Sequence, residues 1–216
     1  ALCVTALSFP LLRQSSPKPP DIAITHRSAP PPRDGWRLAI FLLMFGLYVG
    51  MEVTFAGWVT AYGVLSGTAP ADAALLVTLF WLTLSAGRLL AIPLIRLLSP
   101  WKVLRGCLSL GLFGALALHF LWLPLSLVAL LFGLALSAIF PTLFGLSNQL
   151  MPSSGRTTGW IFLASGLGGM AIPSLTGPLL ERAGTNAFPV LLIALVGLLL
   201  LGLTLLRARV KRGTGR

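Results

Sequence analysis

The residue with the clearest chemical meaning in this 216-residue sequence is Glu52, an acid in the middle of a long apolar stretch. Helical steps of three and four residues place aromatic residues on its face. That face carries Phe41, Phe45, Tyr48, Glu52, Phe55, Val59 and Tyr62. Such a face is typical of a polar binding cavity, so we expect Glu52 to bind a solute or a proton. Its expected neighbours at the solute are Tyr48, Phe55 and Tyr62.

Arg88 is the expected partner of Glu52. Helical rise places Glu52 about 21 Å and Arg88 about 15 Å from one predicted membrane surface, and an arginine side chain can bridge that difference. Pairing would make both charges tolerable, because an unpaired charge costs about 2.5–3.5 kcal/mol on insertion scales. Two alternatives stay open. Arg88 extends toward the membrane surface instead, or Glu52 only joins two helices while the tyrosines pack.

A second apolar stretch, residues 125–150, repeats the pattern with small and polar residues near one face. They are Gly133, Ser137, Pro141, Phe144 and Asn148. Pro141 lacks a backbone N–H and predicts an interruption of the helix, where a freed carbonyl needs a partner. Pro141 is therefore a candidate site residue. Asn148, near the predicted cytoplasmic end, is a candidate for a gate, a cap or an interface.

Small residues elsewhere predict close helix packing. Gly46, Gly50 and Gly57 lie opposite the aromatic face of the first stretch. In residues 157–180 a small residue or a proline recurs at every fourth position, at Ser165, Gly169, Pro173 and Gly177. Both patterns favour helices whose backbones approach one another closely.

The sequence contains no residue set for enzyme or metal chemistry. Its two His and five acidic residues form no ligand cluster, and it has neither a GxxxxGK[ST] phosphate loop nor a GxSxG nucleophile motif. Cys3 and Cys107 form no CxxC motif. We therefore expect no enzyme activity, no cofactor and no metal.

The composition indicates a membrane protein. Hydrophobic residues make up 56% of the chain, charged residues 10%, and the mean hydropathy is +0.91. Soluble domains have about 45–50% apolar and about 25% charged residues, so a soluble enzyme, a secreted disulfide scaffold and a disordered chain are excluded. The net charge of +11 comes from Lys and Arg between apolar stretches, which favours membrane orientation over nucleic-acid binding.

Apolar windows divide the chain into elements that position these residues. They cover 38–64, 73–98, 103–122, 125–150, 157–180 and 187–206. Each can cross a hydrocarbon core of about 30 Å, and a helix satisfies its own backbone there. We predict an all-α membrane protein with six transmembrane helices over residues 38–206. Five is the alternative, since only Leu123 and Pro124 separate two windows.

The flanking segments predict the orientation. Residues 1–12 are apolar but too short to span, and we interpret them as the end of a truncated helix. The basic, Pro-rich residues 13–37 predict a cytoplasmic linker, and residues 207–216 a basic cytoplasmic tail. With both ends in the cytoplasm, all but two of the 16 Lys and Arg residues, Arg88 and Arg182, lie on that side. The predicted location is a plasma or inner membrane.

Four sequence segments carry a resemblance to a known family. They are YVGMEVTFAGWVTAY (48–62), GRLLAIPLIRLLSPWKVL (87–104), IFPTLFGL (139–146) and GWIFLASGLGGMAIPSLTGPLLE (159–181). Together with the linker they resemble the second half of a major facilitator superfamily transporter. The Gly-x-Glu at 50–52, followed by Trp58 and Tyr62, is most similar to the fucose permease-like branch, which includes sugar symporters.

The resemblance implies two parallel six-helix halves that rock about a solute between them, with 38–64 and 125–150 lining the cavity. The partners would be a lipid bilayer, a small polar solute such as a sugar, protons, and an upstream six-helix half or a second copy. The loop around Arg96 and Lys102 lacks the acidic residue usual in the superfamily. Proton-driven efflux of a lipophilic drug or metabolite stays an alternative, as does a non-transporting six-helix assembly module or inactive half.

Overall fold

The computed structural model describes residues 35–151 and 154–214. Every regular element in these ranges is an α-helix, and six helical spans are long and apolar enough to cross a membrane. The prediction of an all-α membrane protein with six spans is confirmed. The predicted truncated helix at 1–12 and the predicted linker up to residue 34 lie outside the described residues.

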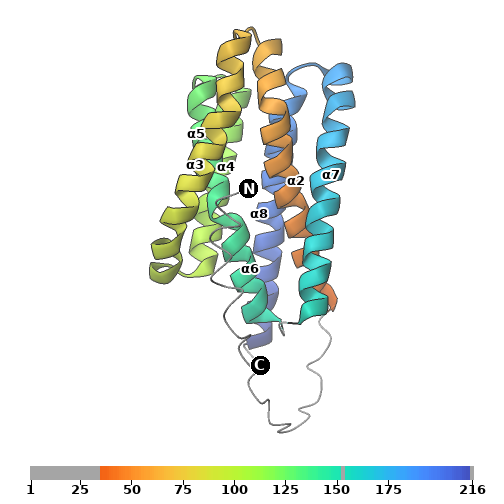
Figure 1. The fold of residues 1–216 in the computed structure, drawn as a ribbon. Helices are drawn as coiled ribbons and strands as arrows, with labels where there is room; N and C mark the ends of the chain where they lie inside the picture. The colour runs from red at the N-terminus through yellow and green to blue at the C-terminus, as the bar shows by residue number, and fades with distance from the viewer. Residues whose placement is uncertain (1–34, 152–153, 215–216) are drawn as a thin grey trace, which may run out of the picture. The chain divides into compact units, whose positions relative to one another are not determined.

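The helices follow one another with short connections. They are α2 (Gly35–Leu65), α3 (Pro70–Leu97), α4 (Pro100–His119), α5 (Leu125–Ser137), α6 (Ile139–Leu150), α7 (Gly155–Ala183) and α8 (Ala187–Thr214). Figure 1 shows α6 continuing from the end of α5, and the two together form the span Leu125–Leu150.

The outermost helix ends differ from the predicted boundaries. α2 begins at Gly35, inside the segment predicted as linker. α8 continues to Thr214, through most of the residues predicted as tail. Arg and Lys are good helix formers and are favourable near a helix C-terminus, so the basic residues extend α8 rather than end it. The Arg209 guanidinium lies over the Trp36 ring, 5.3 Å from its centroid, which ties this extension to the start of α2.

Local sequence signals explain where other helices begin and end. Proline stands in the first turn of α3 and of α4, where its missing N–H costs nothing. Ser154 caps α7 by accepting the Thr157 N–H at 3.1 Å. The break at Leu123–Pro124 is present: α4 ends at His119, Leu121 adopts a φ of 56°, and α5 begins after Pro124. The predicted alternative of five spans is therefore not adopted.

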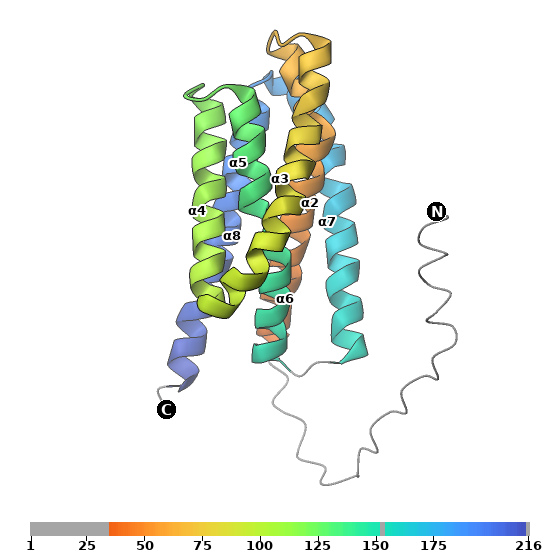
Figure 2. The same cartoon turned by 60° about the vertical axis from the view of Figure 1, so that its left-hand side comes forward.

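Helices α2 and α7 pack closely through small residues and lie side by side in Figures 1 and 2. A Cβ atom at Gly168 would lie 2.0 Å from the Gly46 carbonyl oxygen, and one at Gly50 would lie 2.7 Å from the Gly168 oxygen. These contacts confirm the predicted close approach at Gly46 and Gly50. Gly57 was expected to share this role but does not, because no atom lies within 4 Å of a Cβ built there.

Aromatic rings fill the core beside the second half of α2. Phe55 stacks on Phe132 of α5 with ring centroids 4.5 Å apart, and it also contacts Phe80 of α3 at 4.9 Å and Phe188 of α8 at 6.1 Å. The Tyr62 ring lies 5.1 Å from the Phe188 ring. Because these rings come from four helices, they fix how α2, α3, α5 and α8 sit against one another.

Two helices expose much of their apolar surface. Only 11% of the most apolar window of α7 and 28% of that of α3 are buried within the chain. Exposed side chains include Leu89 and Leu90 on α3, and Leu167 and Met170 on α7. Surfaces of this kind suit contact with lipid or with further helices.

Candidate functional site

Helix α2 places Tyr48 and Glu52 one turn apart on its inward face. The Tyr48 side chain is fully buried, and the Glu52 side chain is 12% exposed. At 1.5 Å per residue, Glu52 lies about 26 Å along the helix from Gly35 and about 20 Å from Leu65. The carboxylate is therefore near the middle of the span, where the Tyr48 hydroxyl donates a hydrogen bond to its Oε2 atom.

Arg88 reaches the same carboxylate from α3. Its Nη2 atom lies 3.4 Å from Glu52 Oε1, so the predicted pairing is present and the guanidinium is directed to Glu52 rather than to a membrane surface. The neighbouring Gly87 allows α3 to approach α5 at this level. A Cβ atom there would lie 2.4 Å from Ser137 Oγ. Because Arg88 follows directly, the small size of Gly87 helps to position the guanidinium.

The third component of the site is the break between α5 and α6. Helix α5 ends at Ser137, and Ala138 (φ −96°, ψ −6°) separates it from α6. Pro141 causes the break, because it has no N–H for the Ser137 carbonyl and its ring crowds that carbonyl. In the last turn of α5, directly before this break, the Leu136 carbonyl accepts a hydrogen bond from the Tyr48 hydroxyl at 3.1 Å. The predicted interruption is confirmed, and Tyr48 of α2 donates to a carbonyl beside it.

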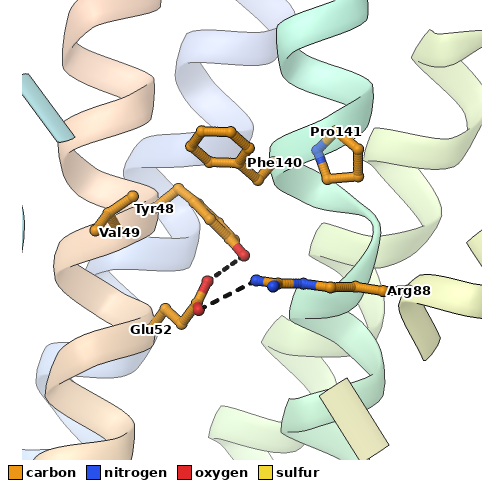
Figure 3. Close-up of a pocket in the computed structure, with 6 residues that line it drawn as sticks. All are labelled: Tyr48, Val49, Glu52, Arg88, Phe140 and Pro141. Atoms are coloured by element: carbon orange, nitrogen blue, oxygen red, sulfur yellow. Dashed lines mark hydrogen bonds and ion pairs between the residues drawn. The ribbon is translucent and has the colours of Figure 1, made fainter. Parts of the chain in front are cut away.

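These three components surround a cavity of about 470 Å³. Figure 3 shows the Tyr48 hydroxyl, the Glu52 carboxylate and the Arg88 guanidinium pointing toward one another, with Phe140 and Pro141 beside them. The lining residues are Tyr48, Val49, Glu52, Arg88, Phe140 and Pro141. We refer to this arrangement as the Glu52 pocket.

Sequence reasoning missed two of the lining residues. Val49 lies beside Tyr48 on α2 but off the aromatic face, so the helical periodicity of that face did not identify it as a site residue. Phe140 precedes Pro141 and is turned by the helix break toward α2. Its ring lies 6.1 Å from the Tyr48 ring and 5.2 Å from the Phe45 ring. The Phe140–Pro141 dipeptide was the one available clue to this position.

The structure places three of the expected site residues outside the pocket. Phe55 is fully buried in the aromatic core, and Tyr62 is almost fully buried against Phe188. Asn148 is exposed on α6, close to the end of that helix at Leu150. A role for any of them in contacting a solute stays a prediction, and such contact would need a site other than the Glu52 pocket.

The chemistry that the pocket offers is hydrogen bonding without net charge. Glu52 and Arg88 carry opposite charges, and the Tyr48 hydroxyl joins them. A neutral molecule with several hydroxyl groups could donate to the carboxylate, accept from the guanidinium and rest an apolar face on Phe140. In the described ranges, no three His, Cys, Asp or Glu side chains lie close enough together to hold a metal ion.

Known proteins show similarity over much of the chain, although no family model matches it. It is 30% identical over 149 residues to sodium-dependent glucose transporter 1A of Mus musculus, which covers 65% of this chain. It is 30% identical over 159 residues to major facilitator superfamily domain-containing protein 4A of Xenopus tropicalis, covering 69%. Protein TsgA of Escherichia coli is 27% identical over 188 residues, covering 83%.

The chain spans about a third of the two vertebrate relatives and less than half of the bacterial one. The matched regions are 34% of the mouse protein, 31% of the frog protein and 44% of TsgA. The mouse relative is by name a transporter of a solute and not an enzyme. The sequence lacks catalytic motifs, from which we expected no enzyme activity. These similarities agree with that expectation.

Proposed function

We propose that this chain, a member of the major facilitator superfamily, contributes a solute-binding site to a secondary transporter of a small polar solute, with sugars as the preferred class. The observation that carries the proposal is the Glu52 pocket. Its carboxylate lies in the middle of a membrane span and is held by Tyr48 and Arg88. A buried acid of this kind is expensive in lipid and typically marks a substrate or ion pathway.

The properties of the pocket favour a neutral, hydroxyl-rich solute. Its two charges cancel, so a solute with a net charge would leave one of them unbalanced. Phe140 offers a ring face against which the C–H side of a sugar can pack. The name of the mouse relative, a glucose transporter, supports the same class.

The proposed architecture includes a second six-helix half. A transporter that works by alternating access needs a site open to one side at a time, and one bundle does not enclose such a site. The sparsely buried faces of α3 and α7 would then contact the other half, encoded upstream or supplied by a second copy. Both ends of the chain lie in the cytoplasm in this proposal, because that orientation places most Lys and Arg residues inside.

The coupling ion is the open part of the proposal. Glu52 is able to carry a proton, which supports proton coupling. The mouse relative is by name sodium-dependent, which supports sodium instead. Uptake driven separately by a proton gradient and by a sodium gradient distinguishes these two mechanisms.

The test is uptake of labelled glucose into vesicles that contain the native full-length polypeptide. Glu52→Gln should lower uptake about tenfold or more, because loss of a charged hydrogen-bonding group costs about 1.5–3 kcal/mol. The matched control is Glu181→Gln, which changes an exposed acid near the end of α7 and should leave uptake unchanged.

Unchanged uptake in a folded Glu52→Gln variant would remove Glu52 from the mechanism. Efflux of a lipophilic dye with no glucose flux would favour the drug-export alternative. A full-length protein that moves neither solute, in either ion gradient, would favour the non-transporting module.

A further inference from the structure

The Tyr48 hydroxyl stands between two acceptors. It lies within hydrogen-bond distance of Glu52 Oε2 and of the Leu136 carbonyl, 3.1 Å away. A phenol has one proton to donate, whereas an ionised carboxylate and a backbone carbonyl only accept. While Glu52 is ionised, the two acceptors therefore compete for a single proton.

Arg88 does not relieve this competition. Its Nη2 atom donates to Oε1, the other oxygen of the Glu52 carboxylate, at 3.4 Å. The remaining lining residues, Val49, Phe140 and Pro141, have no side-chain donor. Within the described pocket the titratable groups facing Glu52 are thus Tyr48 from α2 and Arg88 from α3, while α5 presents the Leu136 carbonyl.

A further hydrogen-bond donor at Glu52 would change which of the two acceptors receives the Tyr48 proton. If a solute hydroxyl donates to Oε2, the carboxylate no longer needs the Tyr48 proton, which then turns to Leu136. The Leu136 carbonyl lies in the last turn of α5 and also accepts the N–H of Ala138 at the break, so the Tyr48 bond connects the break to α2 more firmly. One added hydrogen bond contributes about 0.5–1.5 kcal/mol net, which is enough to change how often the break opens.

We propose that Tyr48 is a positioning residue that couples occupancy of the Glu52 pocket to the break between α5 and α6. A neutral polyol supplies the missing donor to Glu52, and the Tyr48 proton passes from the carboxylate to the Leu136 carbonyl by rotation of the hydroxyl. No covalent bond changes. This inference rests on the proposed function for its solute, but its hydrogen-bond arrangement is tested without one.

The experiment measures amide hydrogen exchange across residues 137–145 in the native full-length protein in lipid nanodiscs. Glucose is the polyol probe. In the wild type, saturating glucose should slow exchange about fivefold, the factor expected for one added hydrogen bond. Tyr48→Phe has no hydroxyl and should lose this response while the protein stays folded. Tyr62→Phe, on the same helix but outside the pocket, is the matched control and should keep it.

A second variant separates this inference from the choice of solute. In Glu52→Gln the side-chain amide is a permanent donor to the Tyr48 oxygen, so exchange at the break should be slow without glucose. Combining it with Tyr48→Phe should return exchange to the fast rate. If glucose is neither bound nor transported, the proposed sugar function fails, and the Glu52→Gln comparison alone decides the role of Tyr48.

Two results would overturn the inference. One is a glucose response of wild-type size in a folded Tyr48→Phe variant. The other is exchange in Glu52→Gln that equals the unliganded wild type.

Discussion

The two tyrosines of this protein lie on the same face of α2, yet their surroundings are opposite in character. Tyr48 joins a carboxylate to a backbone carbonyl and lines a cavity. Tyr62 packs its ring on Phe188, beside a cluster of stacked phenylalanines. Helical periodicity placed both residues inward but could not distinguish a polar site from an apolar core.

The neighbouring helices make the difference. At the level of Tyr48, α3 contributes Arg88, and the end of α5 contributes the Leu136 carbonyl. At the level of Phe55 and Tyr62, the neighbours contribute rings. A polar site in a helical bundle thus depends on the residues that two or three helices present at one depth, and one helix alone does not define it.

The largest expected effect on stability comes from a substitution in the aromatic core around Phe55. Phe132→Ala removes the ring that stacks on Phe55 and should lower the free energy of unfolding by about 3–5 kcal/mol. Phe140→Ala, at the rim of the pocket, should cost less because that ring already borders a cavity. Unfolding of both variants in the same detergent makes the comparison. A larger loss at Phe140 would contradict the division into core and pocket.

Much of the fold followed from the sequence because its signals are local. Apolar windows predicted the six spans, and Pro141 predicted an interruption whose centre the structure places at Ala138. The continuation of α8 through the basic residues after Leu206 was not predicted, because charge alone does not show whether a helix continues past the apolar window.

The site was partly predictable for the same reason. Glu52 and Arg88 could be paired because residue counting gives their depths in the membrane. The placement of Phe55 and Tyr62 depends on rings from α3, α5 and α8, which periodicity within α2 does not contain. Phe140 enters the pocket because the backbone turns at Ala138. Pro141 predicts that the helix is interrupted but not the direction in which the turn points Phe140.

Gly87→Ala, next to the Glu52 pocket, should have a smaller effect on stability. The new Cβ atom would lie 2.4 Å from Ser137 Oγ and should cost about 1–3 kcal/mol through overpacking, partly offset by the better helix propensity of alanine. Because Arg88 is displaced with α3, glucose affinity should fall as well. Binding and unfolding measured on the same samples test this.

Gly106→Ala is the matched control for Gly87→Ala. No atom lies within 4 Å of a Cβ built at this position of α4, so alanine should leave solute binding unchanged and stabilise the helix slightly. Equal behaviour of the two variants would show that close packing at Gly87 does not position Arg88.

The smallest effect is expected from Tyr62→Phe. The described contact of Tyr62 is made by its ring, which phenylalanine retains, so the free energy of unfolding should change by less than about 0.5 kcal/mol. Solute uptake should also be unchanged. A strong loss of uptake in this variant, with stability preserved, would identify Tyr62 as a solute contact and would contradict the proposed difference between Tyr62 and Tyr48.

The most direct test of the central claim asks whether a solute reaches Glu52. A hydrophobic carbodiimide modifies carboxyl groups within membranes, and mass spectrometry reports the modification of Glu52 and of the exposed Glu181 as separate peptides. In the native full-length protein, glucose should slow modification of Glu52 in a saturable manner and leave Glu181 unaffected. Modification of Glu52 at the same rate with and without a solute that the protein demonstrably transports would contradict the claim that the Glu52 pocket is the binding site.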